Sequence, residues 1–110
     1  MGKHIERGDV FWVNLDPTVG SEIKKHRPCA VLTVNPFNDV RRTVVVMPLS
    51  TAVTPHPPLV VAVPSAGKTS TAKIDQLRAV DKSRFTKHEG KLSSHDMHAI
   101  EHALKTVLGL

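Results

Sequence analysis

The sequence predicts a mainly β, α+β domain that ends in one α-helix. Short apolar runs recur over residues 10–80, separated by proline, glycine or asparagine, which is typical of a small barrel or compact sheet. Apolar residues then recur at helical spacing over residues 97–108. A chain of 110 residues has the length of one domain and can bury only a modest core. We therefore expect a single domain over residues 1–110.

Six apolar runs are predicted as strands because they are rich in β-branched, aromatic and aliphatic residues. They cover residues 10–15, 29–34, 43–49, 59–63, 70–74 and 77–80. Asp16-Pro17 ends the first run, since proline lacks the N–H that a sheet requires. Residues 35–39 have the composition of a turn, and residues 81–91 are charged and predicted to be irregular.

The C-terminal helix has a start signal, an apolar stripe and a stop signal. Ser93 or Ser94 can cap its N-terminus, and Gly109 can end it. The stripe consists of Met97, Ile100, Leu104, Val107 and Leu108. The residues His95, His98 and His102 fall off this stripe and are expected to face solvent. Residues 98–102 match an H-x-x-E-H zinc motif, but a catalytic zinc needs a third protein ligand, so we expect no metal site.

Composition restricts the function without deciding it. Lys and Arg number 15 against 10 Asp and Glu, a net charge of +5 that modestly favours polyanionic partners. A single cysteine, Cys29, rules out an internal disulfide framework and fits a reducing cytosol. The first residues are polar and no apolar run could span a bilayer. We expect a soluble, cytoplasmic protein with no membrane partner, with Cys29, Phe11 and Trp12 in its core.

The segment between the first two strands holds the candidate chemistry. Attack of a hydroxyl group on a phosphate ester without a metal requires a base for that hydroxyl, a cation for the phosphoryl oxygens and an acid for the leaving oxygen. Glu22 can act as the base and Arg27 as a planar phosphate clamp. Ser50 and Thr51, at the end of the third strand, can hydrogen-bond the phosphate. The alternative is that Glu22 and Arg27 form a surface ion pair of little energetic value.

The order and spacing of several motifs resemble the MazF/PemK toxins of bacterial toxin–antitoxin pairs. The motifs are Arg7-Gly8-Asp9, Asp16-Pro17-Thr18-x-Gly20-x-Glu22, Arg27-Pro28, Phe37-Asn38, Asp75-Gln76-x-Arg78-x-x-Asp81-Lys82 and Leu108-Gly109-Leu110. The resemblance covers nearly the whole chain. It implies a small SH3-like β-barrel of the PemK/CcdB toxin type with a C-terminal helix. It also implies a homodimer that works without a cofactor and pairs with an acidic antitoxin.

The resemblance further implies a sequence-specific, metal-independent endoribonuclease that cuts single-stranded mRNA, leaving 2′,3′-cyclic phosphate and 5′-hydroxyl ends. The implied catalytic residues are Glu22, Arg27 and Thr51. Further RNA contacts are expected from Ser21, Lys24, Lys25, His26, Phe37, Asn38, Ser50, Asp75 and Gln76. In the PemK-like branch an arginine and an aspartate on a later strand carry catalysis. Lys73 stands at that arginine position, with Asp75 as its partner, so we favour the first set.

Two other functions remain possible from the sequence. A CcdB-like gyrase inhibitor shares the implied fold but has no nuclease site. A non-catalytic barrel that binds nucleic acid would use the basic charge without cutting. An RNA cleavage assay with a chelator present separates the three.

Overall fold

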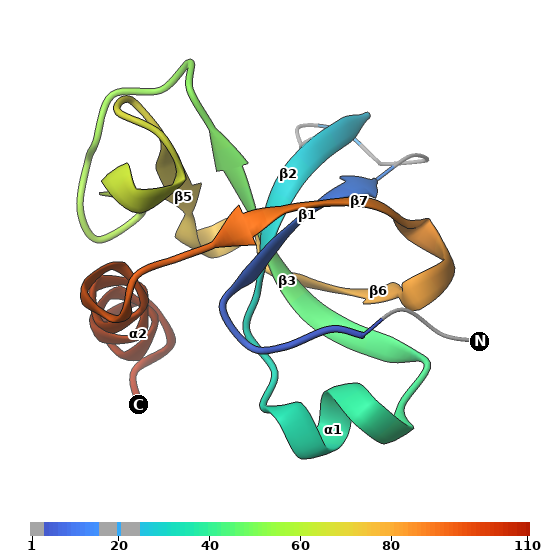
Figure 1. Ribbon diagram of the computed structural model, residues 1–110. Helices are drawn as coiled ribbons and strands as arrows, with labels where there is room; N and C mark the ends of the chain where they lie inside the picture. The colour runs from blue at the N-terminus through green and yellow to red at the C-terminus, as the bar shows by residue number, and fades with distance from the viewer. Residues whose placement is uncertain (1–3, 16–19, 21–24) are drawn as a thin grey trace.

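The computed structural model describes residues 4–15, 20 and 25–110, and within them the chain forms a curled antiparallel sheet and two α-helices (Figure 1). The strands are β1 (Asp9–Asn14), β2 (His26–Val31), β3 (Thr43–Ser50), β4 (Val60–Ala62), β5 (Thr71–Lys73), β6 (Arg78–Asp81) and β7 (Phe85–Lys91). The helices are α1 (Asn35–Val40) and α2 (Ser94–Leu108), and three short 3-10 turns are η1 (Pro64–Ala66), η2 (Ile74–Gln76) and η3 (Lys82–Arg84).

The strands follow the order β4-β5-β3-β2-β1-β7, with β6 pairing with β3 beside that path. All of these pairings are antiparallel. The long strand β3 therefore joins two parts of the sheet, because β2, β5 and β6 all pair with it. The result is the predicted mainly β fold with a C-terminal helix, as an open rather than a closed barrel.

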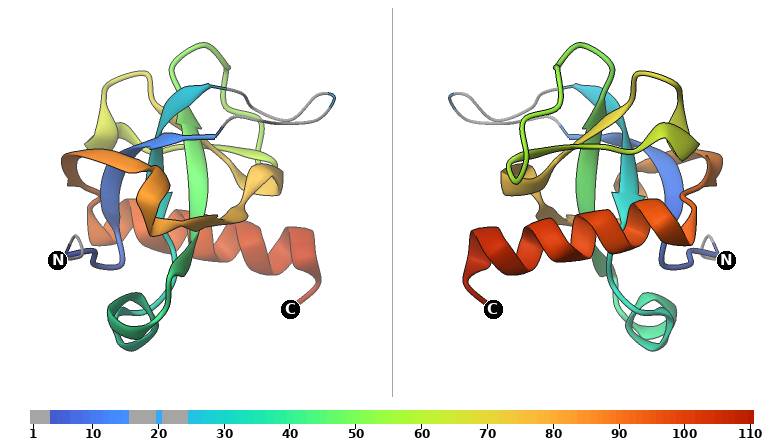
Figure 2. Two further views of the ribbon diagram at one scale, coloured as in Figure 1. Left: turned by 90° about the vertical axis from the view of Figure 1, so that its right-hand side faces the viewer. Right: turned by 90° about the vertical axis from the view of Figure 1, so that its left-hand side faces the viewer.

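Strand alternation divides the core between the two faces of the sheet. Val10 and Met47 belong to one buried cluster, while their neighbours Phe11 and Val46 belong to the other. The first cluster also takes in buried residues of α2, and Figure 2 shows that helix lying along one side of the sheet. The second cluster fills the curled interior. Cys29 is fully buried there, which confirms its predicted structural place, and burial raises the pKa of its thiol to about 12.

Helix α2 has the predicted boundaries. Ser93 is its N-cap and accepts a hydrogen bond from the Asp96 N–H, while Gly109 closes it in the left-handed conformation at φ 71°. His95, His98 and His102 are exposed, as expected. The predicted stripe is wrong at its end, since Leu108 is exposed and Ala103 is buried instead.

Two predicted irregular segments are regular in the structure. Residues 35–40 form α1 rather than a turn, because Pro36 suits the first turn of a helix and its missing N–H has no partner to lose there. Residues 85–91 form β7, an edge strand that pairs with β1. Most of β7 is exposed, so it lacks the apolar alternation by which a strand is recognised in a sequence.

The second strand also starts earlier than predicted. β2 begins at His26, so Arg27 and Pro28 lie within the strand, opposite Val13 and Trp12 of β1. This strand places Arg27, predicted as catalytic, and His26, predicted as an RNA contact, on a rigid element. No helix in the described part of the chain is both long and apolar enough to cross a membrane.

Candidate active site

A hollow of about 410 Å³ opens where β1, β2 and the end of β3 meet the segment that follows η1. Its lining combines apolar strand residues with polar and charged groups from several parts of the chain. These residues are Val10, Trp12, His26, Arg27, Pro28, Leu49, Ser50, Thr51, Ala66, Ser70 and Glu89. We call this hollow the β1–β3 pocket.

Four predicted site residues line the β1–β3 pocket. Arg27 and His26 come from β2 and are exposed, and Ser50 and Thr51 come from the end of β3. The Ser50 hydroxyl accepts a hydrogen bond from the Ala52 N–H at 3.1 Å, which shapes the chain as it leaves the strand. The pocket therefore brings an arginine, a histidine, a serine and a threonine together from separate stretches of sequence.

A backbone hydrogen bond joins the two ends of the connection between β1 and β2. The Leu15 N–H donates to the Lys25 carbonyl at 2.9 Å. Lys25 adopts a left-handed conformation, with φ 70°, which is unusual for a residue other than glycine. It is exposed. The predicted base Glu22 and the predicted RNA contacts Ser21 and Lys24 lie outside the described residues.

His26 is held in place by two neighbours. Its Nε2 lies 2.6 Å from the Thr86 Oγ1 on β7, and its ring centroid lies 5.2 Å from that of Trp12. Thr86 also donates to the Trp12 carbonyl at 3.2 Å. Because these contacts fix the imidazole at the pocket wall, a bound phosphate or base meets it in one orientation.

Two predicted RNA contacts lie on α1, which projects from the opposite end of the sheet from the loop after β3 (Figure 2). Asn38, a predicted RNA contact, is 2% exposed, and its side-chain polar groups are used internally. Its Nδ2 donates to the Thr33 carbonyl at 2.7 Å, and its Oδ1 accepts from the Thr33 hydroxyl at 2.6 Å. Phe37 is exposed but lines a different hollow, together with Val40 and Ala79.

Lys73 and Asp75 do not line the β1–β3 pocket. Lys73 is the last residue of β5 and pairs with Val60, whereas Asp75 is exposed in the turn η2. Gln76, in the same turn, is also absent from the pocket lining. Their roles in RNA contact stay predictions.

The remaining wall of the pocket depends on a buried carboxylate. Ala66 and Ser70 line the pocket, and Ser65, which precedes them, is tied to Asp96 of α2. Asp96 is 2% exposed, and its Oδ2 accepts from the Ser65 N–H at 2.8 Å and from the Ser65 hydroxyl. This contact fixes the position of η1 relative to α2, and with it the pocket wall.

Sequence reasoning missed several lining residues, among them Trp12 and Glu89. Trp12 was expected in the core, but it is half-buried on β1 and turned to the pocket, while its neighbour Phe11 is 4% exposed. Strict alternation along β1 was the available signal for Trp12. The sequence contained no such signal for Glu89, because β7 has no apolar pattern. Among the described residues, no group of three or more His, Cys, Asp or Glu side chains is placed to hold a metal ion.

Residues 6–108 match the family described as PemK-like, MazF-like toxin of type II toxin–antitoxin system. The endoribonuclease toxin MazF of Escherichia coli K12 is 26% identical over 105 residues, which is 94% of each chain. The endoribonuclease PemK of Escherichia coli is 31% identical over 109 residues, covering 94% of this chain and 82% of PemK.

Solved structures agree with the fold. A MazF from Deinococcus radiodurans superposes with a TM-score of 0.87 at 23% identity, covering 98% of this chain and 99% of that one. A mycobacterial endoribonuclease in complex with its cognate antitoxin gives a TM-score of 0.78 at 26% identity, covering 98% of this chain and 96% of that one.

Proposed function

We propose that this chain, which belongs to the PemK-like, MazF-like toxin family of type II toxin–antitoxin systems, is an endoribonuclease that cuts single-stranded RNA. The β1–β3 pocket carries the proposal, because Arg27 of β2 and Thr51 after β3 both line it. Curated relatives over nearly the full chain are named endoribonucleases. The substrate is mRNA, and its cleavage stops translation and growth.

In the proposed reaction, the ribose 2′-oxygen attacks the adjacent phosphorus and the bond to the 5′-oxygen breaks. A base takes the 2′-hydroxyl proton and an acid gives one to the leaving 5′-oxygen, so the products are a 2′,3′-cyclic phosphate and a 5′-hydroxyl. Arg27 offers a planar guanidinium, which fits two phosphoryl oxygens at once. Thr51 offers a hydroxyl donor to the same phosphate. Glu22 is proposed as the base.

The test is cleavage of a long, unstructured RNA by the purified protein with EDTA present. We expect cutting at a short recognition sequence to continue in the chelator, with cyclic phosphate at the new 3′ ends. Activity that disappears with EDTA and returns with magnesium would contradict the mechanism. Intact RNA together with trapped gyrase–DNA complexes would favour the CcdB-like alternative.

The proposed protein partner is an acidic antitoxin. The solved mycobacterial endoribonuclease is in complex with its cognate antitoxin, and this chain carries a net charge of +5. Lys25 and Arg27, both exposed, place positive charge beside the pocket, where a carboxylate-rich peptide competes with RNA phosphates. Titrating labelled RNA against the antitoxin tests this, and simultaneous binding without mutual weakening would refute the overlap.

The proposed assembly is a homodimer. Apolar side chains are exposed around α1, with Val34 at 47%, Phe37 at 56% and Val40 at 78%. Phe37 and Val40 line a hollow of about 470 Å³, together with Val45 and Ala79. An apolar surface of this kind marks an interaction site, and a second copy offers the same surface for a two-fold contact.

Light scattering at micromolar concentration tests the dimer. The double variant Phe37→Asp with Val40→Asp should halve the mass, whereas Leu110→Asp should not, although Leu110 is 85% exposed. A wild-type monomer with full cleavage activity would rule the dimer out as the working unit.

A further inference from the structure

The single tryptophan of this chain forms a wall of the β1–β3 pocket rather than part of the core. Trp12 lies on β1 opposite Pro28 of β2, and Pro28 is next to Arg27. Pro28 lines the pocket as well. An indole beside the proposed phosphate clamp is where a base attached to that phosphate would lie.

The indole is held in one orientation by its neighbours. Its Nε1–H donates to the Glu89 Oε1 at 3.0 Å, and the His26 ring lies 5.2 Å away, centroid to centroid, at an interplanar angle of 44°. Because the edge of the ring is fixed by a hydrogen bond to a carboxylate, little side-chain freedom is lost when a ligand stacks on its face. Aromatic side chains at such positions bind bases through stacking, with little dependence on base identity.

Glu89 adds a means of discrimination. It is exposed on β7, lines the same pocket, and the contact with Trp12 engages one of its two carboxylate oxygens. An ionised carboxylate only accepts hydrogen bonds, so it favours a base that presents an amino group. Uracil has no amino group. Its one donor, the imino N3–H, lies between two carbonyl oxygens that an ionised carboxylate repels, so uracil is disfavoured there.

We propose that Trp12 and Glu89 form a nucleobase subsite of the β1–β3 pocket, in which the indole stacks on one base and the Glu89 carboxylate selects adenine, cytosine or guanine over uracil. This inference rests on the proposed function for its substrate, a single-stranded RNA. It assigns binding and specificity, not bond breaking, to the two residues.

Intrinsic fluorescence measures occupancy of this subsite directly, because Trp12 is the only indole in the chain. The probes are short 2′-deoxy oligonucleotides of adenine, cytosine or uracil, which lack the attacking hydroxyl and so bind without being cut. We expect the adenine and cytosine probes to quench Trp12 and to bind about tenfold more tightly than the uracil probe. Fluorescence anisotropy of labelled probes measures binding independently of Trp12.

Matched variants separate specificity from charge. Glu89→Gln should abolish the preference against uracil, because an amide both donates and accepts. Asp39→Asn removes the same charge from an exposed position on α1 and should leave the preference unchanged. Trp12→Ala should weaken all three probes by about tenfold, and circular dichroism checks its fold, with Trp12→Phe as the milder replacement.

The outcomes distinguish this inference from the proposed function. Quenching with base preference but no RNA cleavage by the wild type would keep the subsite and reject the nuclease. Cleavage without quenching at saturating probe would reject the subsite and keep the nuclease. The subsite is also wrong if Glu89→Gln discriminates as well as the wild type, or if no probe binds at all.

Discussion

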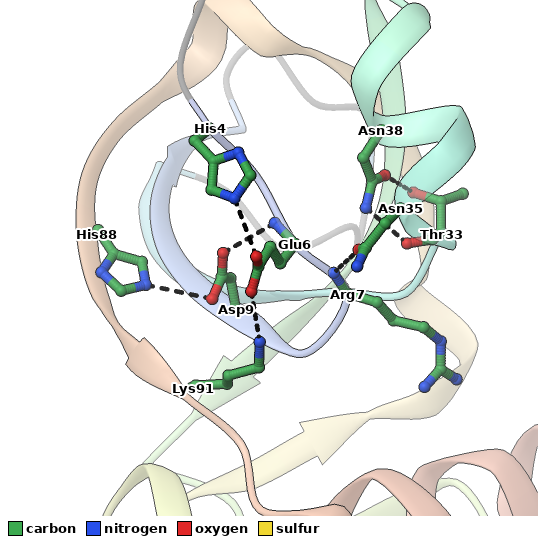
Figure 3. Close-up of polar contacts among 9 residues, drawn as sticks. All are labelled: His4, Glu6, Arg7, Asp9, Thr33, Asn35, Asn38, His88 and Lys91. Carbon is green, nitrogen blue, oxygen red and sulfur yellow. Dashed lines mark hydrogen bonds and ion pairs between the residues drawn. The ribbon is translucent and has the colours of Figure 1, made fainter.

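The two ends of strand β1 differ in how their polar groups are used. At the Asp9 end, charged side chains are paired with one another and with the backbone (Figure 3). Asp9 is 7% exposed, accepts from the Glu6 N–H at 2.9 Å and lies 3.3 Å from the His88 Nε2. At the Trp12 end, the strand instead borders an open pocket that is also lined by Arg27, His26, Ser50 and Thr51.

The motif Arg7-Gly8-Asp9 belongs to the first, braced end. Arg7 donates from Nε to the Leu32 carbonyl at 3.0 Å and from Nη2 to Glu101 of α2 at 2.7 Å. Its backbone N–H donates to Asn35, at the start of α1. Gly8 has φ 91°, a conformation that other residues rarely adopt. This family motif therefore connects the N-terminus, both helices and the sheet.

The comparison shows that the motifs of one family can serve two purposes, stability at one end of β1 and activity at the other. Residues of the braced end have their polar groups satisfied by the protein, so changing them should cost stability. Residues of the pocket line a space that a ligand can enter, so changing them should cost activity. The following predictions test this division.

The largest effect is expected from Arg27. Arg27→Ala and Arg27→Lys should both fold and both lose cleavage by about a hundredfold or more, as for removal of one charge-stabilising donor. Lysine keeps the charge but not the planar fork, so the pair separates geometry from charge. Single-turnover cleavage and thermal unfolding measure the two properties, and Arg41→Ala, at an exposed position after α1, is the control.

One outcome would contradict this assignment of the catalytic residues. If Arg27→Ala cuts at the wild-type rate while Asp75→Ala is inactive, the catalytic groups lie around Lys73 and Asp75. Within the favoured assignment, Glu22→Gln should bind RNA but cut slowly. Thr51→Val should fall between the wild type and Arg27→Ala.

The second effect concerns Asp9 at the braced end. Asp9→Ala leaves the Glu6 N–H and His88 without their carboxylate partner, which should lower the free energy of unfolding by about 1–3 kcal/mol. Urea unfolding followed by circular dichroism measures this. Cleavage per folded molecule should stay at the wild-type level, and a large loss of rate in fully folded Asp9→Ala would contradict the division.

The smallest effect is expected from Glu6, whose carboxylate is solvent-exposed. Hydrogen bonds from Lys91 and His4 lower the pKa of Glu6 to about 2, and the same contact raises the pKa of His4. The Glu6 contribution is therefore present above its ordinary pKa of 4.5 and is lost as the pH falls towards 2. The His4 contribution is present below 6.5 and is lost as the pH rises through its raised value.

Thermal unfolding of the wild type and Glu6→Gln measures this small effect. The difference between their midpoints should be largest between about pH 4.5 and 6.5, where both contributions are present, and should shrink in acid. A constant difference from pH 2 to pH 8 would show that charge at Glu6 is not the cause.

Local patterns in the sequence determined the parts of this fold that depend on neighbours along the chain. The capped helix from Ser93 to Gly109 follows from capping chemistry and helical spacing, and the structure has both ends as expected. The burial of Cys29 follows from strand alternation. The order and spacing of the family motifs predicted Arg27 and Thr51 as candidate site residues, because proteins that share such motifs share a fold.

Tertiary structure alone decided the features that depend on partners far away in the sequence. Glu89 reaches Trp12 across 77 positions, on an edge strand whose register with β1 shifts twice, so no local pattern encodes their contact. Asn38 is buried where Thr33 satisfies its amide, and the Lys82 ammonium donates to its backbone carbonyl across 44 positions. In both cases hydrogen bonds formed on folding, rather than the polarity of the residue, fix whether the side chain faces solvent, a pocket or the interior.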